Sequence, residues 1–241
     1  MTNLPILLRG EIQRMKKYNI LTGGFAVALL WVAALHFLDR GFVEGLFTTL
    51  LFVDLVSMPA ILAAVSLFYE REEGALHAML VAPISHREYV LSKMLGNVFS
   101  SLLTLVLMYL YVRLFKGMSP NVPILVMAAV LASAFHTLVG LLLTYKSRDF
   151  TGMLMGYMVY ALVFMIPVML DHVGVVSNKF FRIILSLCPP RAVSVLLDSA
   201  VVELQWGEIL YGFLYLTVVG GLLFRTAVEG FSQFAQREVG V

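Results

Sequence analysis

The chain contains 241 residues, of which 60% are apolar and only 13% are charged, and its formal net charge is +2. Soluble globular proteins carry about 25% charged residues, so this composition argues against a water-soluble domain and indicates a membrane protein. The small net charge argues against nucleic-acid binding, and the single cysteine, Cys188, excludes an intrachain disulfide and a cysteine metal cluster.

Six stretches are long and apolar enough to cross a bilayer as helices. A hydrocarbon core about 30 Å thick takes roughly 20 helical residues to span, and a helix bonds its own backbone amides within that core. The sequence therefore predicts an all-α membrane protein with a single transmembrane domain over residues 1–241. Its six expected spans are residues 20–38, 46–69, 94–115, 122–145, 150–170 and 206–224.

The distribution of lysine and arginine predicts which ends of the spans face the cytoplasm. With the N-terminus inside, 11 of the 17 basic side chains lie on the cytoplasmic side, as the positive-inside rule favours. We therefore expect a multi-pass protein of the plasma or inner membrane with both termini in the cytoplasm. The first span is expected to remain uncleaved, because the cleavage-like triplet at residues 26–28 lies inside its apolar run.

Residues 3–19, before the first span, have the pattern of an amphipathic helix. Apolar side chains recur three or four positions apart, while the basic side chains lie elsewhere. Such a helix is expected to lie on the inner leaflet; the alternative is a basic flank that only sets the topology. The apolar residues are Leu4, Leu8, Ile12, Met15 and Tyr18.

The cytoplasmic segment between the second and third spans, residues 70–93, predicts a short helix followed by a sharp turn. Its composition is helical as far as Val81, and Pro83 should stop the helix. Ser85 and Glu88 have the spacing of a capping box that starts the next helix. The alternative is a solvated connecting loop.

The outer segment over residues 173–203 is apolar but is divided by Pro189 and Pro190. Each half is too short to cross a bilayer. We expect two short re-entrant helices before the last span, because a seventh span would also move the C-terminus outside.

Asp54 is an ionisable residue within the second span, where burying a charge costs at least ~2.5 kcal/mol. It should therefore face a partner or a water-filled path, and a functional site and a structural pair both remain open. His136, in the fourth span, is a conceivable partner and otherwise a packing histidine.

The fifth span is predicted to have two different faces. Gly152 and Gly156 form a Gly-x-x-x-Gly pair that allows a close helix approach, and Pro167 should bend the outer end. A methionine face is flexible enough to accept varied hydrophobic ligands, although lipid contact or core packing would explain it equally. Its members are Met155, Met158, Met165 and Met169.

Sequence motifs for catalysis are missing from the chain. It has no Gly-x-x-x-x-Gly-Lys-Ser/Thr loop, no Gly-x-Ser-x-Gly and no His-Glu-x-x-His. We therefore expect no catalytic residues, no metal site and no cofactor on this chain, and a membrane enzyme is disfavoured.

The cytoplasmic segment resembles a family motif. Residues 73–77, Glu-Gly-Ala-Leu-His, followed by Leu80 and Pro83-Ile84-Ser85, are similar to the acidic-Gly-Thr-Leu-Glu and Pro-hydrophobic-Ser pattern of permease subunits of the type-2 export family of ATP-binding cassette (ABC) transporters. Ala75 and His77 differ from the usual Thr and Glu. Within the family, the chain most resembles fluoroquinolone export permeases, on the combination of the Glu-Glu-Gly turn at residues 72–74, residues 147–150, Pro167, Pro190 and Trp206.

This resemblance implies a half-transporter that works with separate ATPase subunits, which bind ATP and Mg, and with a second permease, identical or a sister. Residues 70–85 would be the coupling helix, lodged in a groove of the ATPase. The resemblance implies polar contacts from four residues, an apolar anchor from two leucines, and turn geometry from the rest. These residues are Glu70, Arg71, Glu72 and Glu73; Leu76 and Leu80; and Gly74, Pro83 and Ser85.

The implied activity is export of a hydrophobic or amphipathic compound, such as a fluoroquinolone antibiotic, with a role in multidrug efflux and antibiotic resistance. An ABC exporter of lipid or hydrophobic peptide is an alternative cargo assignment. An ATP-independent secondary transporter or channel that uses Asp54 is a further alternative, although no inverted repeat is evident.

Overall fold

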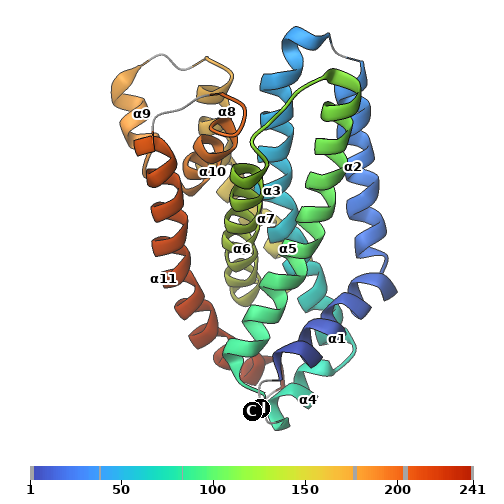
Figure 1. Cartoon of the computed structure of the whole chain (residues 1–241). Coiled ribbons are helices and arrows are strands. Elements are labelled where there is room, and N and C mark those ends of the chain that lie inside the picture. Colours follow the sequence, from blue (N-terminus) through green and yellow to red (C-terminus); the bar gives the residue numbers. More distant parts are fainter. Residues whose placement is uncertain (1–2, 38, 83, 176–177, 203–205, 240–241) are drawn as a thin grey trace.

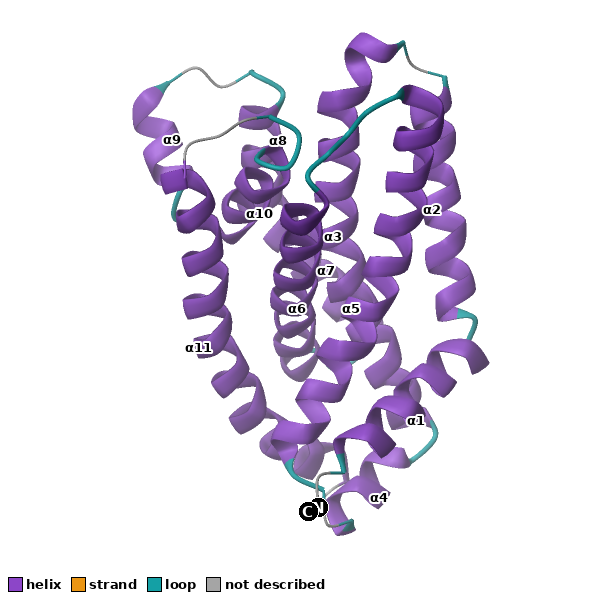
Figure 2. Cartoon of the chain, viewed as in Figure 1, coloured by secondary structure: helices purple, strands orange, loops and turns teal. Residues whose placement is uncertain are grey.

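The computed structural model describes residues 3–37, 39–82, 84–175, 178–202 and 206–239, which form helices and short connections without a strand (Figure 2). The predicted all-helical fold class is therefore confirmed for the described residues. In chain order the elements are α1 (Leu4–Lys17), α2 (Ile20–His36), α3 (Arg40–Glu72), α4 (Ala75–Val81), α5 (His86–Tyr111), η1 (Val112–Lys116), α6 (Val122–Lys146), α7 (Phe150–Tyr160), η2 (Ala161–Met165), α8 (Ile166–His172), α9 (Lys179–Leu185), α10 (Pro189–Asp198) and α11 (Trp206–Val239). The η segments are π-helices.

Five continuous helical segments are long and apolar enough to cross a membrane. They are Phe42–Glu72, His86–Lys116, Val122–Lys146, Phe150–His172 and Trp206–Arg237. A sixth candidate is the pair α1 and α2, which meet at a 66° bend. The described chain thus has five or six candidate spans, which supports the expected multi-pass membrane protein.

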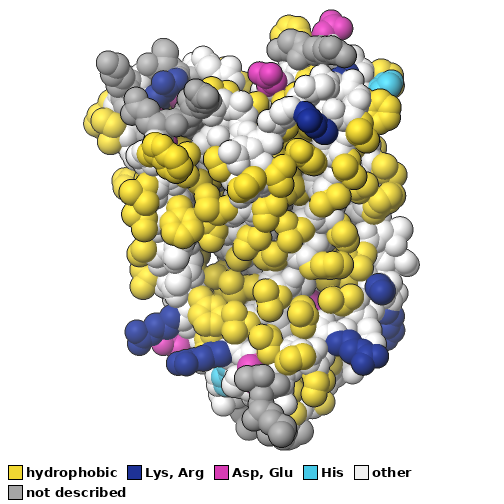
Figure 3. All heavy atoms as spheres, in the orientation of Figure 1, with side chains coloured by type: hydrophobic (Ala, Val, Ile, Leu, Met, Phe, Trp, Pro, Cys, Tyr) yellow, Lys and Arg dark blue, Asp and Glu magenta, His cyan; other side chains and the backbone are white. Residues whose placement is uncertain are grey.

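The molecule has two polar ends separated by an apolar band. α1, α4 and the C-terminal part of α11 gather at one end, and α8, α9 and α10 lie at the other (Figure 1). Hydrophobic side chains cover the middle of the displayed face, whereas charged side chains gather toward both ends (Figure 3). This distribution suits a bilayer around the middle of the helices.

α3 and α6 approach each other closely at Gly140. A Cβ atom placed on Gly140 would lie 2.2 Å from the carbonyl oxygen of Ala60. Ala60 and Ala64 are fully buried here. Small residues therefore bring the two backbones together, as they do in membrane helix pairs generally.

The Pro-split outer segment forms two short helices, α9 and α10, as predicted. Pro189 and Pro190 occupy the first turn of α10, where a missing N–H costs nothing. Asp171, at the end of α8, ties both helices down: its carboxylate lies 2.7 Å from Nε of Arg182 and 2.8 Å from Nη1 of Arg191. The outer helices are thereby fixed to the candidate span Phe150–His172.

The candidate span Phe150–His172 is interrupted before Pro167. α7 gives way to the π-helix η2, which leads into α8. Proline has no N–H, and its ring collides with the carbonyl four residues earlier, so the regular hydrogen-bond pattern cannot continue through it. A π turn absorbs this disruption and rotates the helix face that follows.

Candidate functional site

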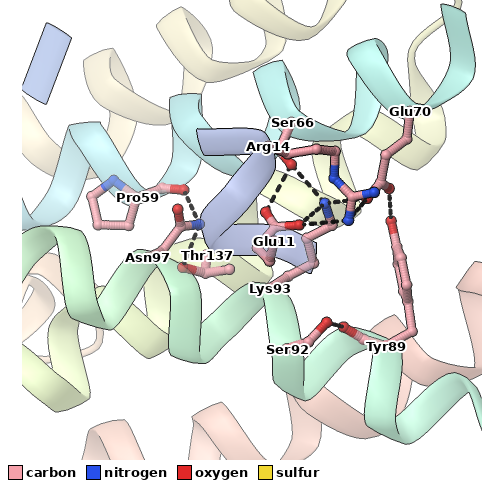
Figure 4. A network of polar contacts seen from close by, with 10 residues as sticks. All are labelled: Glu11, Arg14, Pro59, Ser66, Glu70, Tyr89, Ser92, Lys93, Asn97 and Thr137. Carbon is pink, nitrogen blue, oxygen red and sulfur yellow. Dashed lines mark hydrogen bonds and ion pairs between the residues drawn. The ribbon is translucent and has the colours of Figure 1, made fainter. Parts of the chain in front are cut away.

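Four charged side chains meet in a buried cluster where α1 crosses α3 and α5 (Figure 4). Lys93 of α5 places its Nζ 2.7 Å from Oε2 of Glu11 on α1 and 2.7 Å from Oε1 of Glu70 on α3. Arg14 Nη2 lies 3.0 Å from Oε2 of Glu11 and 2.6 Å from Oε1 of Glu70. Glu11, Glu70 and Lys93 are 2%, 0% and 1% exposed, so these ions depend on one another rather than on water.

Hydroxyl groups complete the hydrogen bonding of the cluster. Ser66 donates to Oε1 of Glu11 at 2.7 Å, and Lys93 donates to Oγ of Ser66 at 2.6 Å. The Tyr89 hydroxyl donates to Glu70. The three N–H donors of Lys93 thus have three acceptors. Among the described residues, Nε of Arg14 is one of two buried side-chain polar atoms without a partner.

The electrostatic balance keeps the Glu11 carboxylate charged. Burial alone raises the pKa of Glu11, but the charges of Lys93 and Arg14 outweigh it and hold that pKa below its ordinary value. Removing one partner from a buried ion pair costs about 3–5 kcal/mol, whereas replacing the whole pair by apolar groups is often neutral. The cluster is therefore better suited to fixing the relative positions of α1, α3 and α5 than to adding stability.

α4 lies next to this cluster and is joined to it on both sides. Gly74, with a positive φ of 69°, ends α3 and lets the chain turn into α4. On the other side, Oγ of Ser85 accepts from the Glu88 backbone N–H at 3.2 Å, and the Glu88 carboxylate accepts in return. This confirms the predicted capping box.

The C-terminal end of α1 also contacts the end of α3 that leads into α4. Lys17 and the Tyr18 hydroxyl both donate to the Glu73 carboxylate, and these hydrogen bonds lower the pKa of Glu73. The Tyr18 ring stacks on Tyr69 with 3.9 Å between ring centroids. The described contacts therefore connect α1, α3, α4 and α5 at one end of the molecule.

A family model described as ABC-2 family transporter protein matches residues 36–228, which is most of the chain. The chain belongs to this ABC-2 family. The matched region begins at the end of α2. It includes α4 as well as Glu70 and Lys93 of the buried cluster. No curated protein matches the chain.

Membership makes the chain a membrane subunit of an ABC transporter. Such ABC-2 subunits are generally non-catalytic and normally work with an ATPase partner. The matched segment contains the residues for which the resemblance implies ATPase coupling.

Some of the expected coupling residues of this ABC-2 chain are exposed and others are buried. Arg71, Glu72 and Glu73 are exposed at the end of α3, and Arg71 donates to the backbone oxygen of Arg148 at 2.7 Å. Glu70 is buried in the ion cluster, so its carboxylate is not at the surface for a polar contact with a partner.

Leu76, expected to anchor the chain to the ATPase, is also buried. Leu76 is 2% exposed and packs in a core cluster with Tyr89 and Phe231, so it anchors α4 to its own chain. The side chain of Leu80 and the whole of Pro83 lie outside the described residues.

Asp54 and His136 have separate partners. Asp54 is 2% exposed and accepts a hydrogen bond from Nε1 of Trp31 at 3.1 Å. His136 is fully buried, with Nδ1 2.8 Å from the Ala132 carbonyl and Nε2 3.1 Å from the Tyr160 hydroxyl. The described contacts therefore give each residue a structural partner and do not pair them with each other.

The four methionines between Phe150 and His172 differ in exposure. Met155 and Met158 are 61% and 58% exposed, whereas Met165 is 8% exposed and lies within 3.8 Å of the Ser57 hydroxyl. Met169 is half-buried. The π turn η2 lies between Met158 and Met169 and changes the helical period there, so the predicted methionine face is not evenly exposed.

The Gly-x-x-x-Gly pair of α7 does not make the close backbone approach that its motif predicts. A Cβ atom on Gly156 would meet the Leu143 side chain at 3.4 Å, an ordinary contact, and one on Gly152 would meet the cap residue Asp149. Within the described chain, Gly140 performs the close packing instead.

The sequence alone does not single out Glu11, Arg14, Ser66 or Lys93 as one site. A usable signal exists for Glu11, which falls at helical spacing on the apolar stripe of α1 between Leu8 and Met15. A carboxylate on an apolar stripe needs a buried partner. Nothing in a single sequence identifies that partner as Lys93, which is 82 positions away.

Proposed function

We propose that this ABC-2 chain is the permease subunit of an ATP-driven exporter that moves a hydrophobic or amphipathic compound out of the cell. Two separate ATPase subunits would bind ATP and Mg, and a second permease, identical or a sister, would complete the transporter. The observation that carries the proposal has two parts: the buried cluster ties α1, α3 and α5 to one another, and Leu76 packs α4 into a core with Tyr89 of α5 and Phe231 of α11.

This attachment suits a lever between the ATPase and the spans. An ATPase contacting the exposed Glu72 and the outer face of α4 would push on helices that are tied to one another. Separating them would break buried ion pairs at about 3–5 kcal/mol, so they should move together as a rigid body. ATPase closure would then tilt α3 and α5, the helices at either side of α4.

The cargo we propose is an amphipathic compound of drug size, such as a fluoroquinolone antibiotic. An apolar groove of about 470 Å³ between α3 and α8 supports a ligand of this class, because drug-sized ligands occupy pockets of about 300–1,000 Å³. Thr49 and His172 add polar groups to walls formed by Phe42, Leu46 and Met169. A lipid or a hydrophobic peptide would meet the same surface and is the alternative cargo.

Affinity purification of the tagged chain from its native membrane tests the partnership. A copurifying ABC ATPase supports the proposal. Reconstitution into proteoliposomes tests the mechanism: the chain with its ATPase should concentrate the compound in an ATP-dependent manner, and the chain alone should not. Full transport by the chain alone would overturn the proposal.

A secondary transporter based on Asp54 is the competing function. It predicts that Asp54→Asn abolishes transport driven by an ion gradient without ATP. Under our proposal, Asp54→Asn keeps the hydrogen bond from Trp31 and leaves ATP-dependent transport within about threefold of the unchanged protein, since a neutral acceptor replaces a charged one.

A further inference from the structure

Two arginines border a groove between the start of α5 and the C-terminal half of α11. The groove has a volume of about 440 Å³ and is lined by Arg87, Phe224, Arg225, Val228 and Glu229. It lies at the same end of the molecule as α1 and α4. In Figure 3, cationic side chains near the lower end of α11 border the apolar band. The groove therefore combines a charged rim with an apolar wall.

The charged rim has an excess of positive charge. The side chain of Arg225 is 81% exposed, and its Nε lies 2.9 Å from Oε1 of Glu229, which is 65% exposed. Arg87 is also exposed and faces the same groove. Two guanidinium groups and one carboxylate leave a net charge of +1, which one phosphate monoanion would balance.

The walls of the groove are held in place by neighbouring contacts. His86, the first residue of α5, packs edge to face on Phe231 of α11 with 5.4 Å between ring centroids. Phe224 and Val228 are one helical turn apart and half-buried, so they form a continuous apolar strip beside the arginines. This geometry is fixed without any ligand.

We infer that this groove binds an anionic phospholipid from the leaflet on the α4 side. Arg87 and Arg225 would hold the phosphate, since guanidinium groups match phosphate geometry. Phe224 and Val228 would contact the upper part of an acyl chain. Basic pockets between membrane helices on the cytoplasmic side bind anionic headgroups in this way, and the orientation proposed from the lysine and arginine distribution puts the groove on that side.

Glu229 gives the site a competing anion. Its carboxylate already accepts a hydrogen bond from Nε of Arg225. A lipid phosphate therefore has to share Arg225 with this carboxylate or displace the carboxylate from it. A neutral phospholipid gains less from this exchange because its headgroup cation meets two arginines. The groove is therefore expected to discriminate phosphatidylglycerol from phosphatidylcholine.

Native mass spectrometry of the purified full chain, titrated with phosphatidylglycerol or phosphatidylcholine, tests this site in the absence of any ATPase. Each arginine near an anionic headgroup should contribute about fivefold to affinity. The Arg87→Gln/Arg225→Gln double variant should therefore bind phosphatidylglycerol about 30-fold more weakly, with little change for phosphatidylcholine.

The matched control is the Arg9→Gln/Lys16→Gln double variant, which removes the same charge from exposed positions on α1. Its phosphatidylglycerol affinity should be unchanged. An equal loss in this control would mean general surface attraction and would overturn the site. An unchanged phosphatidylglycerol affinity in the Arg87→Gln/Arg225→Gln variant would also overturn the site. This holds even if that variant no longer copurifies with the ATPase.

Glu229→Gln provides a test of opposite sign in an exposed residue that should not affect folding. It removes the competing carboxylate, so phosphatidylglycerol should bind roughly threefold more tightly. Inorganic phosphate is added in a separate titration to distinguish a free anion from a lipid. Competition by phosphate at concentrations comparable to the lipid would overturn the assignment, because a lipid site also depends on the apolar wall.

Discussion

Lys93 holds the buried cluster together through two carboxylates and a hydroxyl that come from two other helices. Lys93 is buried, so bulk solvent does not reach its ammonium group to replace these partners. The residue-scale consequence is a strong dependence of folding on a single ammonium group.

Lys93→Met should lower the free energy of unfolding in detergent by about 3–5 kcal/mol, because it leaves Glu11 and Glu70 buried with Arg14 as their remaining cation. Denaturant unfolding measures the change. Lys146→Met, at the exposed end of α6, makes the same chemical change and should shift stability by no more than about 0.5 kcal/mol. Equal stability of the Lys93→Met and unchanged proteins would mean that the cluster does not persist in solution.

The lowered pKa of Glu11 predicts a dependence of stability on pH. A carboxyl whose pKa is lower in the folded state stabilises the fold fully above its ordinary value of 4.5 and loses that contribution as the pH falls through the folded value. The free energy of unfolding should therefore decline with acidity below about pH 5, and Glu11→Gln should flatten this decline.

Unfolding measured between about pH 3 and pH 7 tests this expectation. Glu72→Gln removes an exposed carboxyl nearby and serves as the control. If Glu11→Gln and Glu72→Gln give the same slope, the folded protein does not stabilise the charged form of Glu11.

At the scale of elements, the two acidic residues before α4 have different tasks. Glu73 binds Lys17 of α1 and Tyr18, the residue that follows α1, whereas Glu72 is exposed on the last turn of α3. Reversing the charge of Glu73 would therefore disturb α1 as well as any partner. Glu72 alone gives a clean test of contact with an ATPase.

Glu72→Lys should reduce copurification of the ATPase by tenfold or more, roughly, since a reversed charge in an interface costs several kcal/mol. Stability of the isolated chain should not change. Glu44→Lys, an exposed acid at the opposite end of α3, is the matched control and should copurify normally. Normal copurification and transport with Glu72→Lys would remove this residue from the interface.

The close contact between α3 and α6 predicts that a larger residue at position 140 destabilises the protein. Gly140→Ala would place a methyl group 2.2 Å from the Ala60 carbonyl oxygen, and such overpacking costs about 1–3 kcal/mol. Gly156→Ala adds the same methyl group where the nearest neighbour is a side chain at 3.4 Å. Thermal unfolding should separate the two variants, and equal midpoints would show that α3 and α6 are farther apart than described.

At the scale of the whole molecule, the fold was largely predictable because a bilayer imposes long apolar runs that a single sequence displays. The Pro-split helices α9 and α10, the end of α4 at Val81 and the capping box at Ser85 follow equally local rules. The 66° bend at Asn19 also lies between the predicted amphipathic helix and the first span.

The candidate site was less predictable because its contacts join distant parts of the chain. Glu70 belongs to an exposed-looking run of acidic residues, and the partner that buries it comes from α5, 23 positions later. An exposed leucine that contacts a partner and a buried leucine look the same in the sequence at position 76. Leu76 is buried because it packs with Phe231 of α11, which is distant in the chain. The uneven exposure of the four methionines was not predictable, because a π turn changes the helical period and a fixed spacing cannot anticipate it.

The ion cluster also has a consequence for how the chain enters the membrane. Glu11 and Arg14 lie on α1 and balance each other, and Glu70 and Lys93 form a second balanced pair between α3 and α5. The spans can therefore insert as a hairpin whose charges cancel before α1 docks. During biosynthesis, α1 can join the assembled hairpin late without leaving Glu70 or Lys93 without an oppositely charged partner.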